Sequence, residues 1–430
     1  MVIKKLIAFV IILNFTVLSI SSVSAKPNNS NEPEEFVKEF LCAKINTLIT
    51  KNIDDIDKYY SMESENSQKY MMFTKQELLQ DYLIAYASND YAIEKVAPQV
   101  IIISSTIKDD AATVAAILKT EIYWNASNAL GKPIVGMKSE KHLLTLSIEN
   151  NEWKIIVDRY MTNRGHSEQS TKDDLSRLTD TVRELKKAAA DSIDRSKKSR
   201  PARLTLASAN SQIGFHIKNH IENRNKRMLA AGYCKANISE PIATSTYNRD
   251  GAYNWAHTYW DNYSTAYVNL GAQKWEGGDC TNFISQCLKA GGANNDQTGS
   301  YQWFYNSKGT GKTTNDIYSW TWSTARGLNY IVLGNYKANE YGPKGTEKVI
   351  TGDSEYNSSI GQYITLGDII QYQWKPNSKI THAAVIVDML YNSSKELYEP
   401  VIAEHTNNSW HTPWTNNAYK THFVHITGVN

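Results

Sequence analysis

The chain has 430 residues, which is long enough for two or three domains that each bury a core of their own. Its 46 basic and 44 acidic residues nearly cancel, so the charge gives no reason to expect nucleic acid as the main partner. Four cysteines are too few for a disulfide-dense scaffold. The disulfide state of Cys42 and Cys234 stays open at this point.

Residues 1–25 are expected to be a signal peptide rather than part of the fold. Lys4 and Lys5 form a basic start, "LIAFVIILNFTVLSI" is an apolar run, and "SVSA" ends in small residues at Ala25. No second apolar run of this length follows. We therefore expect a secreted or cell-wall associated protein, with no stable membrane insertion after cleavage.

Residues 26–162 predict an α+β domain of helix plus antiparallel sheet. The segment "PEEFVKEFLCAKINTLIT" has apolar residues at helical spacing, and Pro33 suits a first helical turn. Strand-like runs follow, and "ENNE" between the last two predicts a tight hairpin. This order of elements resembles the NTF2-like fold.

Residues 163–246 predict a helical and charged linker. The segment "DDLSRLTDTVRELKKAAADSIDRSKKSRPAR" begins as a helix and continues into a stretch in which basic residues outnumber acidic ones. Such a stretch is typical of a solvated linker. A contact with anionic wall polymers or lipid head groups is the alternative, and salt would weaken it.

Residues 247–430 hold most of the eleven tryptophans and the candidate chemistry. The segment "DCTNFISQCLKAGG" predicts a helix with one apolar stripe that includes Cys287, and glycines end it. Cys280 would then lie at the helix N-terminus, where N–H groups stabilise a thiolate. A bridge to Cys287 is not expected, because seven helical residues rise about 10 Å. Cys280 is therefore either a nucleophile or a structural cysteine.

Two apolar strands, "DIIQYQW" and "HAAVIV", follow about a hundred residues later, and His382 opens the second of them. A third strand, "VIAEHTNN", would return to the start of the His382 strand in antiparallel pairing. It offers Glu404, His405 and Asn407 as groups that could orient the imidazole. If Ala403 faces the cleft, alternation places His405 there too and turns Glu404 away, so His405 is the prediction.

These blocks carry a resemblance to a known family. They are "YNRDGAYNWAHTYW", "GGDCTNFISQCLKAGG", "LGDIIQY", "THAAVIV" and "AEHTNN". Together they resemble the amidase domain family of secreted Gram-positive proteins and are similar to NlpC/P60-type cysteine peptidases. The resemblance covers roughly residues 247–429. It implies a papain-like fold with Cys280 as nucleophile and His382 as base, and His405 is the nearest match to the family's variable polar third position.

The expected activity is that of a secreted cysteine amidase that hydrolyses an amide bond, with cell-wall peptides derived from peptidoglycan as the leading substrates. No cofactor and no metal are expected, because His411, His422 and His425 form no zinc motif. The Cys280 N–H and a second donor that the sequence does not identify would hold the oxyanion. Asp279 would cap the helix, with orientation of a neighbouring loop as its alternative role. The alternative is a non-catalytic wall-binding protein with a degenerate amidase domain.

The signal peptide gives the first testable prediction. Export should be followed by cleavage after Ala25, because the basic start, the apolar run and the small residues match what signal peptidases recognise. Sequencing the N-terminus of the exported protein checks this. A retained segment 1–25 would contradict it.

Overall fold

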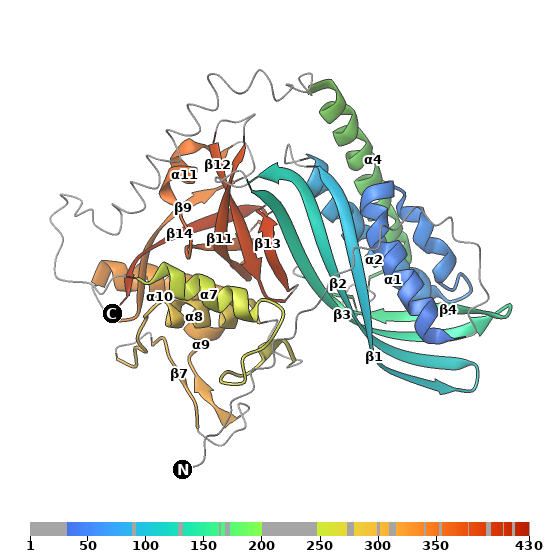
Figure 1. The fold of residues 1–430 in the computed structure, drawn as a ribbon, viewed down its shortest axis with the longest axis horizontal. Helices are drawn as coiled ribbons and strands as arrows, with labels where there is room; N and C mark the ends of the chain where they lie inside the picture. The colour runs from blue at the N-terminus through green and yellow to red at the C-terminus, as the bar shows by residue number, and fades with distance from the viewer. Residues whose placement is uncertain are drawn as a thin grey trace, which may run out of the picture.

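The computed structural model describes residues 32–87, 92–127, 132–162, 165–167, 173–199, 247–272, 279–298, 302–308, 315–338, 341–351, 355–376, 378–392, 397–406, 408–414 and 418–429. The expected signal peptide, Cys234 and Asn407 lie outside these residues. The fold is α+β, with helices beside a large antiparallel sheet (Figure 1). No helix in the described part of the chain is long and apolar enough to span a membrane.

The N-terminal half begins with helices followed by long antiparallel strands, as the sequence predicts, and a further helix follows that the sequence analysis assigned to the linker. Its elements are α1 (Pro33–Thr50), η1 (Ile53–Tyr59), α2 (Glu65–Ala87), β1 (Ile93–Lys108), β2 (Ala111–Ser127), β3 (Pro133–Glu149), β4 (Glu152–Arg159), β5 (Met161–Thr162), β6 (Gly165–His166) and α4 (Leu175–Ser199). The hairpin predicted at "ENNE" joins β3 to β4. Asn150 and Asn151 take φ values of 51° and 62° there, which a two-residue hairpin turn requires.

The helices of this half pack on one side of the sheet formed by β1 to β4 (Figure 1). Strand β2 alternates buried and less buried positions, so one face of it supplies a core row of Ala112, Val114, Ala116 and Leu118. Helix α1 buries Val37, Phe40 and Leu41 in the same core. Helix α4, which opens the expected linker, packs on α2 and buries Leu178 and Val182.

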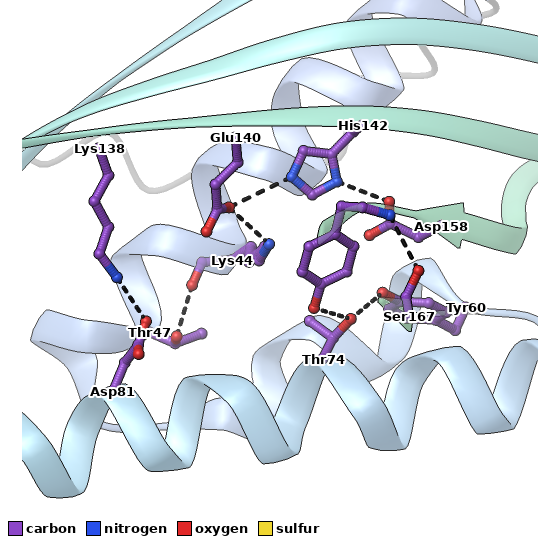
Figure 2. A network of polar contacts seen from close by, with 11 residues as sticks. Lys44, Thr47, Tyr60, Thr74, Asp81, Lys138, Glu140, His142, Asp158 and Ser167 are labelled. Carbon is purple, nitrogen blue, oxygen red and sulfur yellow. Dashed lines mark hydrogen bonds and ion pairs between the residues drawn. The ribbon is translucent and has the colours of Figure 1, made fainter. Parts of the chain in front are cut away.

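A buried network of charges lies between α1 and the sheet (Figure 2). Lys44 of α1 donates to Glu140 of β3 at 3.0 Å, and His142 contacts Asp158 of β4 at 2.7 Å. Burial disfavours the Glu140 carboxylate, but the charges of Lys44 and His142 outweigh it and lower the pKa of Glu140. Burial likewise disfavours the imidazolium, but Asp158 raises the pKa of His142. The network therefore keeps its charges only while its members stay paired.

The C-terminal half has α-helices packed on a set of antiparallel strands. Its elements are α7 (Arg249–Tyr259), η2 (Leu270–Ala272), α8 (Cys280–Ala290), β7 (Tyr305–Asn306), β8 (Ile317–Tyr318), α9 (Trp320–Ser323), α10 (Ala325–Ala338), β9 (Pro343–Ile350), α11 (Ser358–Tyr363), β10 (Ile369–Gln373), β11 (His382–Asn392), β12 (Leu397–Glu404), β13 (Ser409–Pro413) and β14 (Lys420–Val429). Helix α8 packs on β11 and β12 through Phe283, Ile284 and Cys287.

The two halves share one sheet. Within the described residues, ten strands pair in the order β1-β2-β3-β13-β12-β11-β10-β14-β9, with β4 also on β3. The junction is antiparallel pairing of Ser409 and Trp410 in β13 with Lys138 and Met137 in β3. Gly136 of β3 allows β13 to approach, because an added Cβ would lie 3.3 Å from the Thr412 hydroxyl and 3.4 Å from the His411 carbonyl of β13.

The buried network predicts an unequal effect of two lysine substitutions. Lys44→Met leaves a buried carboxylate without its main countercharge, so it should lower the free energy of unfolding by about 3–5 kcal/mol. Lys38 pairs with Glu35 at the surface, where the two side chains are 41% and 57% exposed. Lys38→Met should therefore cost less than about 1 kcal/mol. Chemical denaturation of the variants measures both changes.

The pH dependence of the same difference is a control. The pKa of Glu140 is lowered in the folded state, so its stabilisation is present above its unfolded pKa of about 4.3 and is lost as pH falls toward the folded value. The difference between wild type and Lys44→Met should shrink in acid. Equal costs for the two substitutions at neutral pH would contradict a stabilising role for the network.

Candidate active site

Cys280 is the first residue of α8. The apolar residues on one side of this helix pack on the sheet, so the N-terminal end of the helix also lies against the sheet. The residue is only 5% exposed. Its sulfur lies 3.7 Å from the Thr281 hydroxyl and also interacts with the His382 ring and the Ala383 N–H. Among the described residues Cys42, Cys280 and Cys287 are free thiols. Cys280 and Cys287, one near a histidine and one in the core, therefore have the separate environments that the helix pattern predicts.

His382 begins β11 and is 2% exposed. It pairs across the sheet with Tyr372 of β10, whose ring centroid is 5.5 Å from the imidazole. Trp374 lies further along the same edge, at 6.2 Å. The imidazole Nε2 is 2.7 Å from Oε2 of Glu404, so its N–H donates to that carboxylate. Nδ1 is then the ring nitrogen left for the Cys280 sulfur.

The electrostatics of this set favour a charged cysteine–histidine pair. Burial disfavours the Cys280 thiolate, but the His382 charge and hydrogen bonds from His382, Thr281 and Ala383 outweigh it and lower the pKa of the thiol. Burial also disfavours the imidazolium, but Cys280 and Glu404 raise the pKa of His382 well above its usual range. At neutral pH the arrangement thus stabilises a thiolate beside an imidazolium, which is an activated nucleophile next to an acid.

The predicted position of His405 is wrong, and the pairing register explains why. Val385 of β11 pairs with Ala403 of β12, so these two residues share a face. His382 is three residues before Val385 and therefore lies on the opposite face, which it shares with Glu404. Alternation holds in the strand, but Ala403 faces α8 rather than His382. The group that orients the imidazole in the structure is Glu404, which the sequence argument turned away.

His405 instead belongs to a second buried pair with Asp279. Its Nδ1 is 2.7 Å from Asp279 Oδ2, its Nε2 is 2.6 Å from the Tyr259 carbonyl, and its ring stacks on Phe283 at 4.0 Å. Asp279 makes no side-chain cap on α8, so the expected capping role is wrong and the alternative, orientation of a neighbouring segment, is the one that its contacts fit. Its other oxygen accepts from the Leu270 N–H of η2, and the Asp279–His405 pair joins the start of α8 to the end of β12.

The aspartate of the "LGDIIQY" block has a structural position. Asp368 is fully buried and accepts from the Arg249 guanidinium of α7 at 2.6 Å and from the Ile426 N–H at 3.0 Å. Burial opposes its ionisation, but Arg249 and His425 lower its pKa. Gly367 before it has a φ of 79°, which favours glycine. The block therefore attaches α7 to the sheet and lies apart from the Cys280 contacts.

The remaining C-terminal histidines pair with different carboxylates. His411 contacts Asp388, His422 contacts Glu347, and His425 contacts Asp368. Across the described residues, no group of three or more histidine, cysteine or acidic side chains is arranged to hold a metal ion.

Comparison with known proteins finds a family match in the C-terminal half. Residues 246–427 match a family model described as "Putative amidase domain". The uncharacterized protein YhbB of Bacillus subtilis (strain 168) is 29% identical over 144 residues, which are 33% of this chain and 37% of the relative. The chain thus spans a little over a third of that relative. No solved structure matches the chain. The family match indicates amide hydrolysis and assigns neither the catalytic residues nor the substrate.

Glu404 as a positioning residue gives a prediction about thiol reactivity. In wild type, the rate of Cys280 alkylation by iodoacetamide should reach half its maximum below the ordinary thiol pKa of about 8.5, because His382 and its hydrogen bonds lower the pKa of the thiol. Glu404→Gln removes the charge that stabilises the imidazolium, so the half-maximum should move up toward that value. The measurement is the pH profile of alkylation, with the modified cysteine identified by mass spectrometry.

Glu399→Gln is the matched control, because Glu399 is another buried carboxylate of β12 that bonds Asn392 instead of His382. Its profile should follow wild type. An unchanged profile in Glu404→Gln would remove Glu404 from the site.

Proposed function

We propose that the C-terminal half is a cysteine-dependent amidase with Cys280 as nucleophile, His382 as general base and acid, and Glu404 as the residue that positions His382. The observation that carries the proposal is the contact of the Cys280 sulfur with His382, whose other ring nitrogen is 2.7 Å from Glu404. A thiolate at a helix start beside an oriented imidazolium is the arrangement that nucleophilic attack on an amide requires.

The reaction would take two steps. The thiolate attacks the amide carbon, and the oxyanion lies near the N–H of Cys280, which the first turn of α8 leaves without an intrahelical partner. His382 gives its proton to the leaving amine, and a thioester remains. The neutral imidazole then takes a proton from water, which hydrolyses the thioester and restores the thiolate. Glu404 keeps the ring in one orientation and stabilises each imidazolium state.

The arrangement supports a papain-like organisation for this half. In such a fold a helix presents the cysteine and an antiparallel sheet presents the histidine. Helix α8 packs on β11 and β12, and the start of α8 meets the start of β11. The aromatic rings of Tyr372 and Trp374 cover one side of His382 and reduce its contact with water.

We propose cell-wall peptides as substrates and a secreted or wall-associated location. The basic start and apolar run of residues 1–25 support export, and stem peptides of peptidoglycan are amide substrates available outside the cell. The basic part of residues 163–246 could add a salt-sensitive contact with anionic wall polymers. No contact among the described residues favours the alternative of a non-catalytic wall-binding protein. Digestion of peptidoglycan distinguishes this alternative from an enzyme.

The decisive test is digestion of purified peptidoglycan, with the released products identified by mass. Wild type should release peptide fragments, and Cys280→Ala should lower the rate at least about 1000-fold, because the covalent step is lost. Cys287→Ala is the control for losing a buried thiol. Cys287 is 1% exposed and burial raises its pKa, so its loss should cost about 1 kcal/mol of stability and leave turnover in place.

Equal release by wild type and Cys280→Ala would end the cysteine-amidase proposal. Retained binding to the wall without release in either protein would favour the wall-binding alternative. Loss of turnover in Cys287→Ala with an intact fold would show that the two cysteines are not separated as proposed.

A further inference from the structure

A cavity of about 210 Å³ lies at the junction of the two halves. One wall comes from β3 of the N-terminal half and the other from loops of the C-terminal half. The lining residues are Ser139, Glu140, Lys141, Tyr263, Asn269, Gly271, Thr406 and Asn408. The N-terminal half therefore contributes side chains to a space that the C-terminal half alone would leave open.

The cavity is next to the candidate active site. The Tyr263 ring packs on His405 at 4.9 Å, and His405 bonds Asp279, which directly precedes Cys280. A Cβ on Gly271 would lie 3.7 Å from the Cβ of Asp279. Thr406 is two residues beyond Glu404. A short peptide over Cys280 would thus have this cavity within reach of its neighbouring residue.

The lining contains polar side-chain atoms without a hydrogen-bond partner among the described residues, and a lysine without an ion pair there. Asn408 is 5% exposed, and no residue in the described part of the chain bonds its buried Oδ1 or the Thr406 hydroxyl. Lys141 lies over the Tyr263 ring at 5.2 Å and has no ion pair within the described ranges. The other charged lining residue, Glu140, has its carboxylate on Lys44 inside the N-terminal half. The cavity therefore offers one free positive charge and a buried amide oxygen that accepts an N–H.

The volume of the cavity limits the size of the ligand that it can bind. Pockets for drug-sized ligands measure roughly 300–1,000 Å³, and this cavity is smaller. It fits one amino-acid residue rather than an extended chain. The C-terminal residue of a peptide has both a carboxylate for Lys141 and an N–H for Asn408.

We propose that the cavity binds the C-terminal residue of the peptide that Cys280 cleaves, with Lys141 binding its free carboxylate and Asn408 accepting its peptide N–H. This substrate class, peptides with a free C-terminus close to the scissile amide, rests on the proposed amidase function. The wall from β3 is held in place by the pairing of β3 with β13, by the bond from the Ser139 N–H to the Asn408 carbonyl at 2.8 Å, and by the ion pair of Lys119 with Asp261 at 2.5 Å.

The test compares a synthetic peptidoglycan stem peptide as the free acid and as its C-terminal carboxamide. Binding is measured by calorimetry to the full-length Cys280→Ala protein, and turnover is measured with the active protein. The free acid should bind about tenfold more tightly and show a correspondingly higher kcat/KM, mainly through KM. Lys141→Met, introduced into both proteins, should remove the preference for the free acid, whereas Lys141→Arg should keep most of it. Raised salt should weaken the preference.

Lys95→Met is the matched control, because Lys95 also lies over a tyrosine ring on this sheet, that of Tyr123 at 5.0 Å, and lines no part of the cavity. It should keep the wild-type preference. Equal affinity for the two peptides, or a preference that survives Lys141→Met, would overturn the cavity assignment. Binding that prefers the free acid through Lys141, with neither peptide cleaved by the active protein, would uphold the cavity and reject the amidase function.

Discussion

The carboxylate of Asp279, fully buried at the start of α8, is the constraint on which the site depends. A charge without water needs hydrogen-bond donors. Asp279 takes them from η2, from its own helix and from the end of β12: the Leu270 N–H at 2.9 Å, the Asn282 amide at 2.8 Å and the His405 ring at 2.7 Å. Movement of any segment would leave part of the carboxylate unpaired. The first turn of α8 is thereby held against the end of β12, and Cys280 is held at a set position relative to His382.

Two consecutive residues of the chain serve two histidine–carboxylate pairs on opposite faces of one strand end. Glu404 orients His382 beside the sulfur, and His405 meets Asp279 beneath the helix start. Strand alternation makes this possible, because neighbouring side chains point to opposite sides. In the proposed reaction, the His382–Glu404 pair changes protonation while the His405–Asp279 pair on the other side maintains the geometry. A shift of β12 by one residue would exchange the two roles and disrupt both.

The sequence predicts what local patterns determine. The stripe through Phe283 and Cys287 predicts α8 and places Cys280 at its start, the asparagine pair predicts the β3–β4 turn, and His382 is found at the head of its strand. The partner of His382 could not be chosen, because the choice depends on the pairing of Val385 with Ala403, which is a non-local register. Asp279 has the residue type of a helix cap, yet burial beside His405 uses its oxygens otherwise. The junction of β3 with β13 involves few residues and has no pattern of its own.

The junction of β3 with β13 has a consequence for the stability of a C-terminal half produced without the N-terminal half. Strand β13 is an interior strand only because Lys138 and Met137 of β3 cover its outer edge at Ser409 and Trp410. If the N-terminal half were removed, the backbone N–H and C=O groups of β13 would form an open sheet edge, and Trp410, now 6% exposed, would lose part of its cover. Open apolar edges recruit other chains by strand addition. The N-terminal strand β3 thus covers the sheet edge that β13 would otherwise expose. A separated C-terminal half should self-associate through β13.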